Sequence, residues 1–410
     1  MPDVTNIKDI YIMRKFFTSA LIALAAVSVM AQPVTKAGPE KKGELTFTTV
    51  KENPITPIKN QYRSGTCWCF SGIAFLESEA IRINGIKDPE AYPDFSEMFV
   101  VSHSYQDRAE KYVRLDGNLT FGAGSEIGDV LHIVSDYGLV PQSVQPGTEY
   151  GTELPVHGEL DAVTKAYVEA IAKNPNRTLS TGWKKGFKGI VDAYLGECPT
   201  EFEYNGQTYT PASYRDSYKI NSDDYVSFTS YTHHPFYKKF ALEICDNWRY
   251  DQDWNVPIDD FMAVIDNAIM NGFTVAWASD VSEKGFTRDG LAQLLADAKK
   301  TSGSDQERWV GKSGEPAEES APEEIEATQE FRQKGYDEKS TTDDHGMQIF
   351  GIAKDQFGNK YYMVKNSWGE AGKYKGIWYA SEAFVRGKSM SIFVHKDALP
   401  KDVAKKIGVK

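Results

Sequence analysis

Cys67 stands at the start of an apolar segment with helical spacing, where a thiol can become a nucleophile. The free backbone N–H groups and the dipole at a helix N-terminus favour a thiolate over a thiol, and a cysteine so placed is reactive near neutral pH. Apolar residues recur at helical spacing until Asn84 and Gly85 give a stop signal. The sequence therefore predicts a helix with a candidate nucleophile in its first turn.

A cysteine nucleophile needs a base and a group that orients the base, and both are usually distant in sequence. His345 precedes an apolar segment at 348–353, and Asn366 follows another at 360–364, with turn residues at 355–359 between them. This pattern predicts a β-hairpin whose antiparallel strands bring His345 and Asn366 side by side.

The motifs resemble those of papain-like cysteine peptidases, and the matching residues are Gln61, Gly65-Thr66-Cys67-Trp68, His345 and Asn366-Ser367-Trp368-Gly369. Two departures from papain are similar to the bleomycin hydrolase and aminopeptidase C branch. Ser64 stands where papain has a disulfide cysteine, and the spacing from Cys67 to His345 far exceeds the roughly 130–150 residues of the papain pattern. The resemblance covers about residues 46–403.

The resemblance implies an α+β fold with two lobes, one helical and one formed by an antiparallel sheet or barrel. We expect the peptidase domain at residues 46–397, with a large, mainly helical insertion at about 145–300. A segment at about 301–330 is rich in glutamate among Pro, Ser and Gly, and this composition predicts a mobile loop. Residues 398–410 are expected to form a C-terminal tail.

The resemblance also implies a role for each catalytic residue. Cys67 would attack the peptide carbonyl and form a thioester after His345 accepts its proton. Asn366 would fix the imidazole tautomer. The side-chain amide of Gln61 and the backbone N–H of Cys67 would stabilise the oxyanion.

Gly124 and Trp368 are candidates for substrate binding. Gly124 lies in a segment, 121–126, that resembles the one whose backbone pairs with an extended substrate in this family. The alternative for this segment is a loop in which Ser125 caps the next helix. Trp368 would also shield the Asn–His hydrogen bond from water, and the alternative for Trp68 and Trp368 is core packing.

Kinship implies an aminopeptidase that removes N-terminal residues from peptides. In that branch a C-terminal arm carries the carboxylate that captures the substrate's amino group, and the ending Lys406 to Lys410 looks short of that arm. An endopeptidase or a dipeptide-releasing enzyme is therefore the first alternative. A catalytically idle peptide-binding scaffold is the second. Relatives assemble as hexamers, which implies a homo-oligomer.

Residues 1–31 have the pattern of a secretory signal peptide. Met13-Arg14-Lys15 is followed by an apolar run at 20–27 and by small residues that end at Ala31. We expect a functional start at Met13, cleavage after Ala31 and a flexible mature N-terminus at 32–45. The expected location is the periplasm or the medium, without a stable membrane anchor.

The remaining cysteines and histidines predict no metal and no cofactor. Cys69 is expected to be a small core residue, and a Cys198–Cys245 disulfide is left open. Neither Cys67-x-Cys69 nor His233-His234 has the spacing of a zinc site.

Charge limits the class of partner. The chain has 46 basic and 58 acidic residues and a formal net charge of -12. Broad nucleic-acid binding therefore lacks an electrostatic source, and peptides are the expected substrates.

Overall fold

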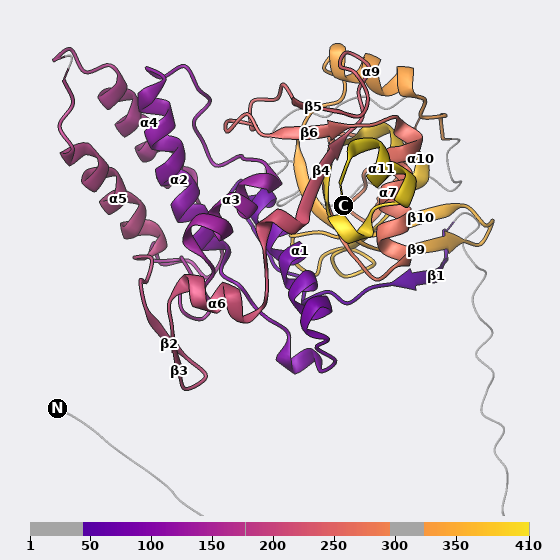
Figure 1. Cartoon of the computed structure of the whole chain (residues 1–410), viewed down its shortest axis with the longest axis horizontal. Helices are drawn as coiled ribbons and strands as arrows, with labels where there is room; N and C mark the ends of the chain where they lie inside the picture. Colours follow the sequence, from indigo (N-terminus) through magenta and orange to yellow (C-terminus); the bar gives the residue numbers. More distant parts are fainter. Residues whose placement is uncertain (1–43, 177, 296–323, 410) are drawn as a thin grey trace, which may run out of the picture. The chain divides into compact units, whose positions relative to one another are not determined.

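The computed structural model describes residues 44–176, 178–295 and 324–409, all within one compact unit, Lys42–Lys410. A ten-stranded sheet has the order β5-β6-β4-β12-β7-β9-β10-β11-β8, with β1 paired to β9 (Figure 1). Most of its pairs are antiparallel, whereas β4–β6 and β11–β8 are parallel. The strands are β1 Phe47–Glu52, β4 Tyr225–Thr229, β5 Lys238–Ala241, β6 Gln252–Asn255, β7 Val275–Ser279, β8 Leu291–Ala292, β9 His345–Asp355, β10 Lys360–Lys365, β11 Ile377–Ser381 and β12 Ser389–His395.

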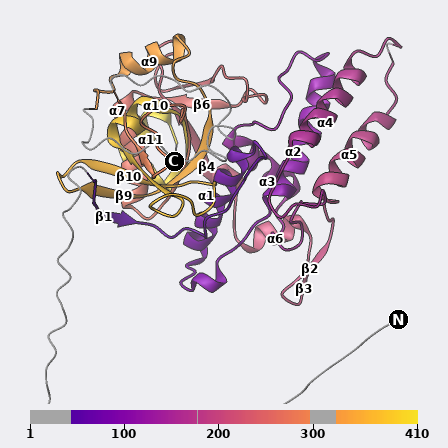
Figure 2. The same ribbon diagram turned by 180° about the vertical axis from the view of Figure 1, so that it is seen from behind.

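Outside this sheet, the described residues form helices and a small two-stranded hairpin, joined by loops and short 3-10 helices. In Figures 1 and 2, α2, α4 and α5 run beside one another, and these three helices contact one another pairwise. The α+β class is therefore confirmed. The elements are α1 Cys67–Asn84, α2 Glu97–Arg114, α3 Ile127–Tyr137, α4 Gly158–Ala172, α5 Gly182–Leu195, α6 Pro211–Ser217, α7 Ile258–Met270, α9 Gln329–Asp337, α10 Glu382–Lys388, α11 Lys401–Ile407, and the strands β2 Phe202–Tyr204 and β3 Gln207–Tyr209.

Helix α1 joins the helical part to the sheet. It is buried on almost every side from Trp68 to Ile81, although this stretch includes Glu77 and Glu79. It packs against α2 and α3 on one side and against β7 and β9 on the other. Gln348 of β9 strengthens this contact by donating hydrogen bonds to the Ala74 carbonyl, 3.2 Å, and to the Ser78 hydroxyl, 2.8 Å.

The predicted limits of α1 are confirmed. The helix begins at Cys67 and ends at Asn84, and Gly85 has a φ of 62°, a left-handed conformation that favours glycine. The N–H of Ile86 closes this end by donating to the Ile81 carbonyl, 3.0 Å. The hydrogen-bonding side chain that often caps a helix N-terminus is missing at Thr66.

The predicted hairpin is also confirmed. Strands β9 and β10 pair antiparallel, with Lys365 opposite Gln348 and Lys360 opposite Lys354. The turn between them is held by the Asp355 carboxylate, which accepts hydrogen bonds from the N–H groups of Phe357 and Asn359.

The residues predicted as an insertion are mainly helical, but they also complete the sheet. Helices α4 to α7 lie within 145–300, and so do strands β4 to β7. Strand β12, close to the C-terminus, pairs with β4 on one side and with β7 on the other. Because β12 is buried along its whole length, the sheet needs strands from the predicted insertion on both sides of it.

Several other predicted segments fall partly or wholly outside the described residues. Residues 1–43, with the expected signal peptide, lie outside, as does most of the acidic segment. Its last residues, from Glu324, are ordered instead of mobile, because the Glu324 carboxylate accepts hydrogen bonds from Leu294 N, 2.7 Å, and from the Ser381 hydroxyl. The expected C-terminal tail contains helix α11, whose Val403 and Ile407 are buried.

None of the helices within 44–176, 178–295 and 324–409 combines the length and the apolar composition that crossing a membrane requires.

Candidate active site

One pocket brings together residues from both halves of the chain. Four parts of the chain meet at this pocket. They are α1, α3, the loop between β5 and β6, and the start of β9. The residues that line it are Cys67, Trp68, Gly124, Ser125, Glu126, Ile127, Asp246, Ala278, Asp343, Asp344, His345 and Gly346. The predicted nucleophile, base and substrate-binding glycine therefore share one pocket.

The first turn of α1 is packed directly against β9. A Cβ added to Gly346 would lie 3.2 Å from the Cys67 carbonyl oxygen and 2.6 Å from the Ser71 hydroxyl oxygen. No side chain fits there, so the strand approaches the helix N-terminus closely. Since His345 precedes Gly346, this approach brings the imidazole to the pocket that contains Cys67.

His345 and Asn366 are joined by a buried hydrogen bond. His345 Nε2 lies 2.8 Å from Asn366 Oδ1, and both residues are about 1% exposed. A carbonyl oxygen only accepts, so the ring carries hydrogen on Nε2. Nδ1 is then the nitrogen that can exchange a proton with a nucleophile. The Asn366 oxygen is itself held by the N–H of Ser367, 2.7 Å.

Trp368 covers this pair. Its ring stacks on the His345 imidazole with a centroid distance of 4.6 Å and an interplanar angle of 29°. The indole packs edge-on against Trp378, 5.5 Å, and Phe286, 6.0 Å. Trp368 thus contacts the base instead of lining the pocket, in keeping with the shielding role.

Gln61 is held beside Asn366 with one donor unused. Its side chain is fully buried, its Oε1 accepts a hydrogen bond from the Ser367 hydroxyl, 2.6 Å, and its backbone N–H donates to the Ser367 carbonyl, 2.8 Å. Within the described part of the chain, Gln61 Nε2 has no hydrogen-bond acceptor. An unsatisfied buried donor is costly, which is typical of a group that serves a ligand.

A network of buried charges fixes the segment before Gln61. Lys59 Nζ lies 3.0 Å from Glu77 of α1 and 2.7 Å from Glu97 of α2. The Thr56 hydroxyl donates to Glu77 and accepts a hydrogen bond from Lys365 Nζ, 2.8 Å. These contacts anchor the segment from Thr56 to Lys59 to α1, α2 and β10. Burial raises the pKa of Glu97 to about 7 and lowers the pKa of Lys365 to about 8.

Arg108, which the sequence did not single out, shapes the glycine-containing segment. The guanidinium lies 2% exposed under that segment and donates hydrogen bonds to the carbonyls of Thr120, 2.8 Å, Gly122, 3.2 Å, and Gly124. An arginine among the apolar positions of α2 was the available signal. The indole of Trp68 adds a hydrogen bond to the Ala123 carbonyl, 2.9 Å.

The alternative in which Ser125 caps the next helix is wrong. The N-cap of α3 is Glu126, which forms a capping box with Asp129. Ser125 links two side chains instead. Its hydroxyl donates a hydrogen bond to the Asp129 carboxylate and accepts one from Trp248 Nε1, 2.7 Å.

Four carboxyl side chains line the same pocket, and sequence reasoning missed them as a group. They are Glu126, Asp246, Asp343 and Asp344. Burial, with Asp246 and Asp344 nearby, raises the pKa of Asp343 to about 8. Burial and the neighbouring carboxylates also raise the pKa of Glu126 well above its usual range. Only Asp343 and Asp344, adjacent to His345, gave a local signal.

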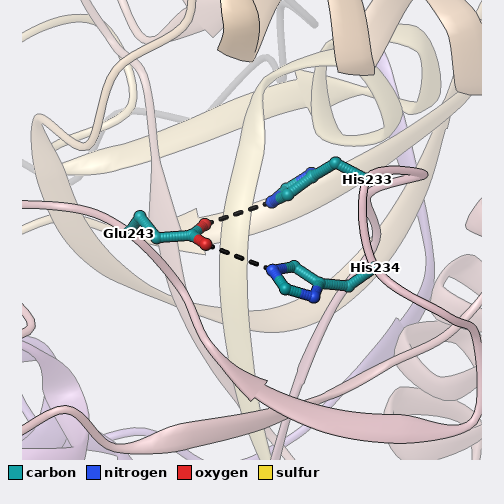
Figure 3. Close-up of side chains that lie close together, drawn as sticks. All are labelled: His233, His234 and Glu243. Carbon is teal, nitrogen blue, oxygen red and sulfur yellow. Dashed lines mark hydrogen bonds and ion pairs between the residues drawn. The ribbon is translucent and has the colours of Figure 1, made fainter.

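The structure adds a third possible metal ligand to the two adjacent histidines. His233 Nε2 and His234 Nε2 each lie 3.1 Å from a different oxygen of Glu243 (Figure 3). These ligand atoms lie within 4.8 Å of one another, and two imidazoles with a carboxylate suit a divalent ion such as zinc. The cluster is largely exposed and does not line the pocket.

The other cysteines are separate from the pocket. Cys69 is fully buried, and its thiol donates to the Glu97 carbonyl, 3.3 Å, so the core placement is confirmed. Cys198 and Cys245 are both free thiols, and the disulfide left open between them is not formed.

The carboxyl cluster makes stability depend on pH. Burial raises the pKa of Asp343 in the folded state to about 8, from its ordinary value of 3.8 in an unfolded chain. Between these values the folded state binds more protons, so stability falls as pH rises. Asp343→Asn cannot ionise, and we expect the fall in the urea midpoint between about pH 5 and pH 8 to be smaller in this variant than in the wild type. An equal fall in both proteins would contradict the raised pKa.

Comparisons with known proteins agree with this geometry. Residues 326–409 match the model of the Peptidase C1-like family. Aminopeptidase G of Lactobacillus delbrueckii subsp. lactis is 23% identical, with 88% of this chain and 85% of the relative covered. Aminopeptidase C of Lactococcus lactis subsp. cremoris is 24% identical, with 84% and 82% covered.

The fold has a solved counterpart. The crystal structure of PepW from Lactobacillus rhamnosis HN001 superposes with a TM-score of 0.66 at 19% identity, covering 88% of this chain and 84% of the other. The chain is thus a cysteine peptidase with a papain-like fold, similar to aminopeptidases C and G.

Proposed function

We propose that this protein removes N-terminal residues from peptides by a Cys-His-Asn thioester mechanism. The observation that carries the mechanism is the buried His345–Asn366 hydrogen bond at the edge of the pocket that contains Cys67. The aminopeptidase activity is supported by relatives named aminopeptidase C and aminopeptidase G, which align with most of the chain.

Each step has a group suited to it. Cys67 lies at the N-terminus of α1, where the backbone dipole favours a thiolate. His345 takes the thiol proton on Nδ1 and later protonates the leaving amine. Asn366 holds the ring by its Nε2 hydrogen, and Trp368 keeps water from that bond. Water then hydrolyses the thioester.

Gln61 Nε2 and the backbone N–H of Cys67 are the proposed oxyanion donors. Gln61→Ala removes a donor that serves the transition state more than the bound substrate, so we expect kcat to fall about 10²–10³-fold with little change in KM. Steady-state kinetics on one fluorogenic amide checks this, with Gln356→Ala on the exposed β9–β10 turn as the control. A Gln61→Ala variant with wild-type kcat would remove this role.

The test of the function compares a free-amine peptide with its N-acetylated twin, followed by mass spectrometry of the products. We expect stepwise loss of single N-terminal residues from the free peptide and no cleavage of the acetylated one. Cys67→Ala should abolish turnover and retain the wild-type circular dichroism spectrum. Internal cleavage of both peptides would instead identify an endopeptidase.

Export to the periplasm or the medium, with cleavage after Ala31, stays a prediction, because that segment lies outside the described residues. Assembly as a homo-oligomer also stays a prediction.

A further inference from the structure

The pocket beside Cys67 is lined by four carboxyl side chains, those of Glu126, Asp246, Asp343 and Asp344. Arg108 Nη2 forms an ion pair with Asp246 Oδ1 at 3.9 Å, a long contact. Arg108 Nε and Nη1 are meanwhile committed to backbone carbonyls.

We propose that Glu126, Asp246 and Asp343 form a subsite for a protonated amino group of the substrate, immediately beside the nucleophile. This subsite rests on the proposed peptidase function and specifies how the substrate is recognised. An ammonium group carries three N–H donors and one positive charge, and this charge would favour the ionised form of carboxyl groups whose pKa burial raises.

An unpartnered atom of Glu126 supports the proposal independently of the charge. Glu126 is 8% exposed, and its Oε1 is buried without a hydrogen-bond donor among the described residues. A buried acceptor of this kind costs free energy unless a ligand supplies the donor. Since the side chain lines the pocket, an ammonium group bound there can supply it.

Asp344 plays a different part from the other three carboxyls. Its carboxylate accepts hydrogen bonds from the Ser282 N–H, 3.2 Å, from the Ser282 hydroxyl and from the Thr342 hydroxyl, 2.7 Å. These donors stabilise its negative charge, so Asp344 adds to the field of the subsite without needing to contact the ligand.

The place of Asp246 explains why the amino group would be terminal. A Cβ added to Gly124 would collide with the Asp246 carboxylate, so this carboxylate lies over the backbone that is expected to pair with substrate. A peptide that continued past Gly124 would have to displace Asp246. A peptide that ends in an ammonium group there can pair with it instead.

The loop that carries Asp246 is firmly held, which favours a preformed subsite. The Asn247 amide donates to the carbonyls of Leu242, 3.1 Å, and Asp251, 3.0 Å. Trp248, 1% exposed, donates to Ser125, and Arg249 pairs with Asp129 at 2.5 Å. The loop is thereby fixed to α3, next to Glu126.

The test measures KM and kcat for Asp246→Asn, which keeps the side-chain shape and removes the charge. Asp402→Asn is the matched control, because Asp402 is 70% exposed on α11 and none of the pocket-lining residues comes from α11. The substrates are the aminomethylcoumarin amides of leucine, acetyl-leucine, acetyl-lysyl-leucine and acetyl-leucyl-leucine. They separate a terminal ammonium group from the side-chain ammonium of lysine.

We expect Asp246→Asn to raise KM for the leucine amide about 10- to 100-fold with little change in kcat, since a charge-assisted contact is lost. Asp402→Asn should leave both constants unchanged. The subsite is also supported if the wild type instead prefers the acetyl-lysyl-leucine substrate over the acetyl-leucyl-leucine substrate and Asp246→Asn removes that preference. The lysine side chain is then the source of the ammonium group. A second variant, Glu126→Gln, is measured in the same way. The subsite is overturned if neither variant changes the preference for leucine over acetyl-leucine or for acetyl-lysyl-leucine over acetyl-leucyl-leucine.

Calorimetric binding in the Cys67→Ala background separates this proposal from the proposed function. Leucine amide should bind at least tenfold more tightly than acetyl-leucine amide, and Asp246→Asn should remove the difference. That result would support the subsite even if the wild type hydrolysed none of the substrates, in which case the peptidase function alone would fail. Equal binding of leucine amide and acetyl-leucine amide would overturn the subsite.

Discussion

The close contact between the first turn of α1 and the start of β9 is the constraint on which the rest of the site depends. It is possible because Gly346 has no side chain to push the strand away from the Cys67 carbonyl and the Ser71 hydroxyl. The helix N-terminus, which favours a thiolate, and the imidazole of His345 therefore meet in one pocket. Most of the surrounding structure serves to hold these two elements in register.

The groups around this contact divide into those that contact His345 and those that have a buried polar atom without a partner among the described residues. Asn366 and Trp368 fix and cover the imidazole of His345. Gln61 Nε2 and Glu126 Oε1 are buried polar atoms without partners among the described residues, one a donor and the other an acceptor. A peptide with a free amino group offers the complement of both, a carbonyl oxygen and an ammonium group. In the proposed function, the pocket binds the N-terminal end of a peptide.

The sequence predicts those parts of the site that are set by local pattern. The limits of α1 and the β9–β10 hairpin follow from helical spacing, a stop at Gly85 and turn residues. It does not predict that β12 needs β4 and β7 as neighbours, or that Arg108 donates hydrogen bonds to the carbonyls of the glycine-containing segment. The carboxyl cluster was missed for the same reason. Its members are far apart in sequence, and only the folded chain brings them together.

The central claim is that Cys67 is held as a thiolate by His345, and the rate of its modification by iodoacetamide as a function of pH tests this most directly. We expect rapid modification at about pH 5–6, well below the ordinary cysteine pKa of about 8.5, in a Cys245→Ser background that removes the exposed thiol. His345→Ala should shift the profile to higher pH. A rate that rises only near pH 8–9 in the protein with His345 intact would contradict the account.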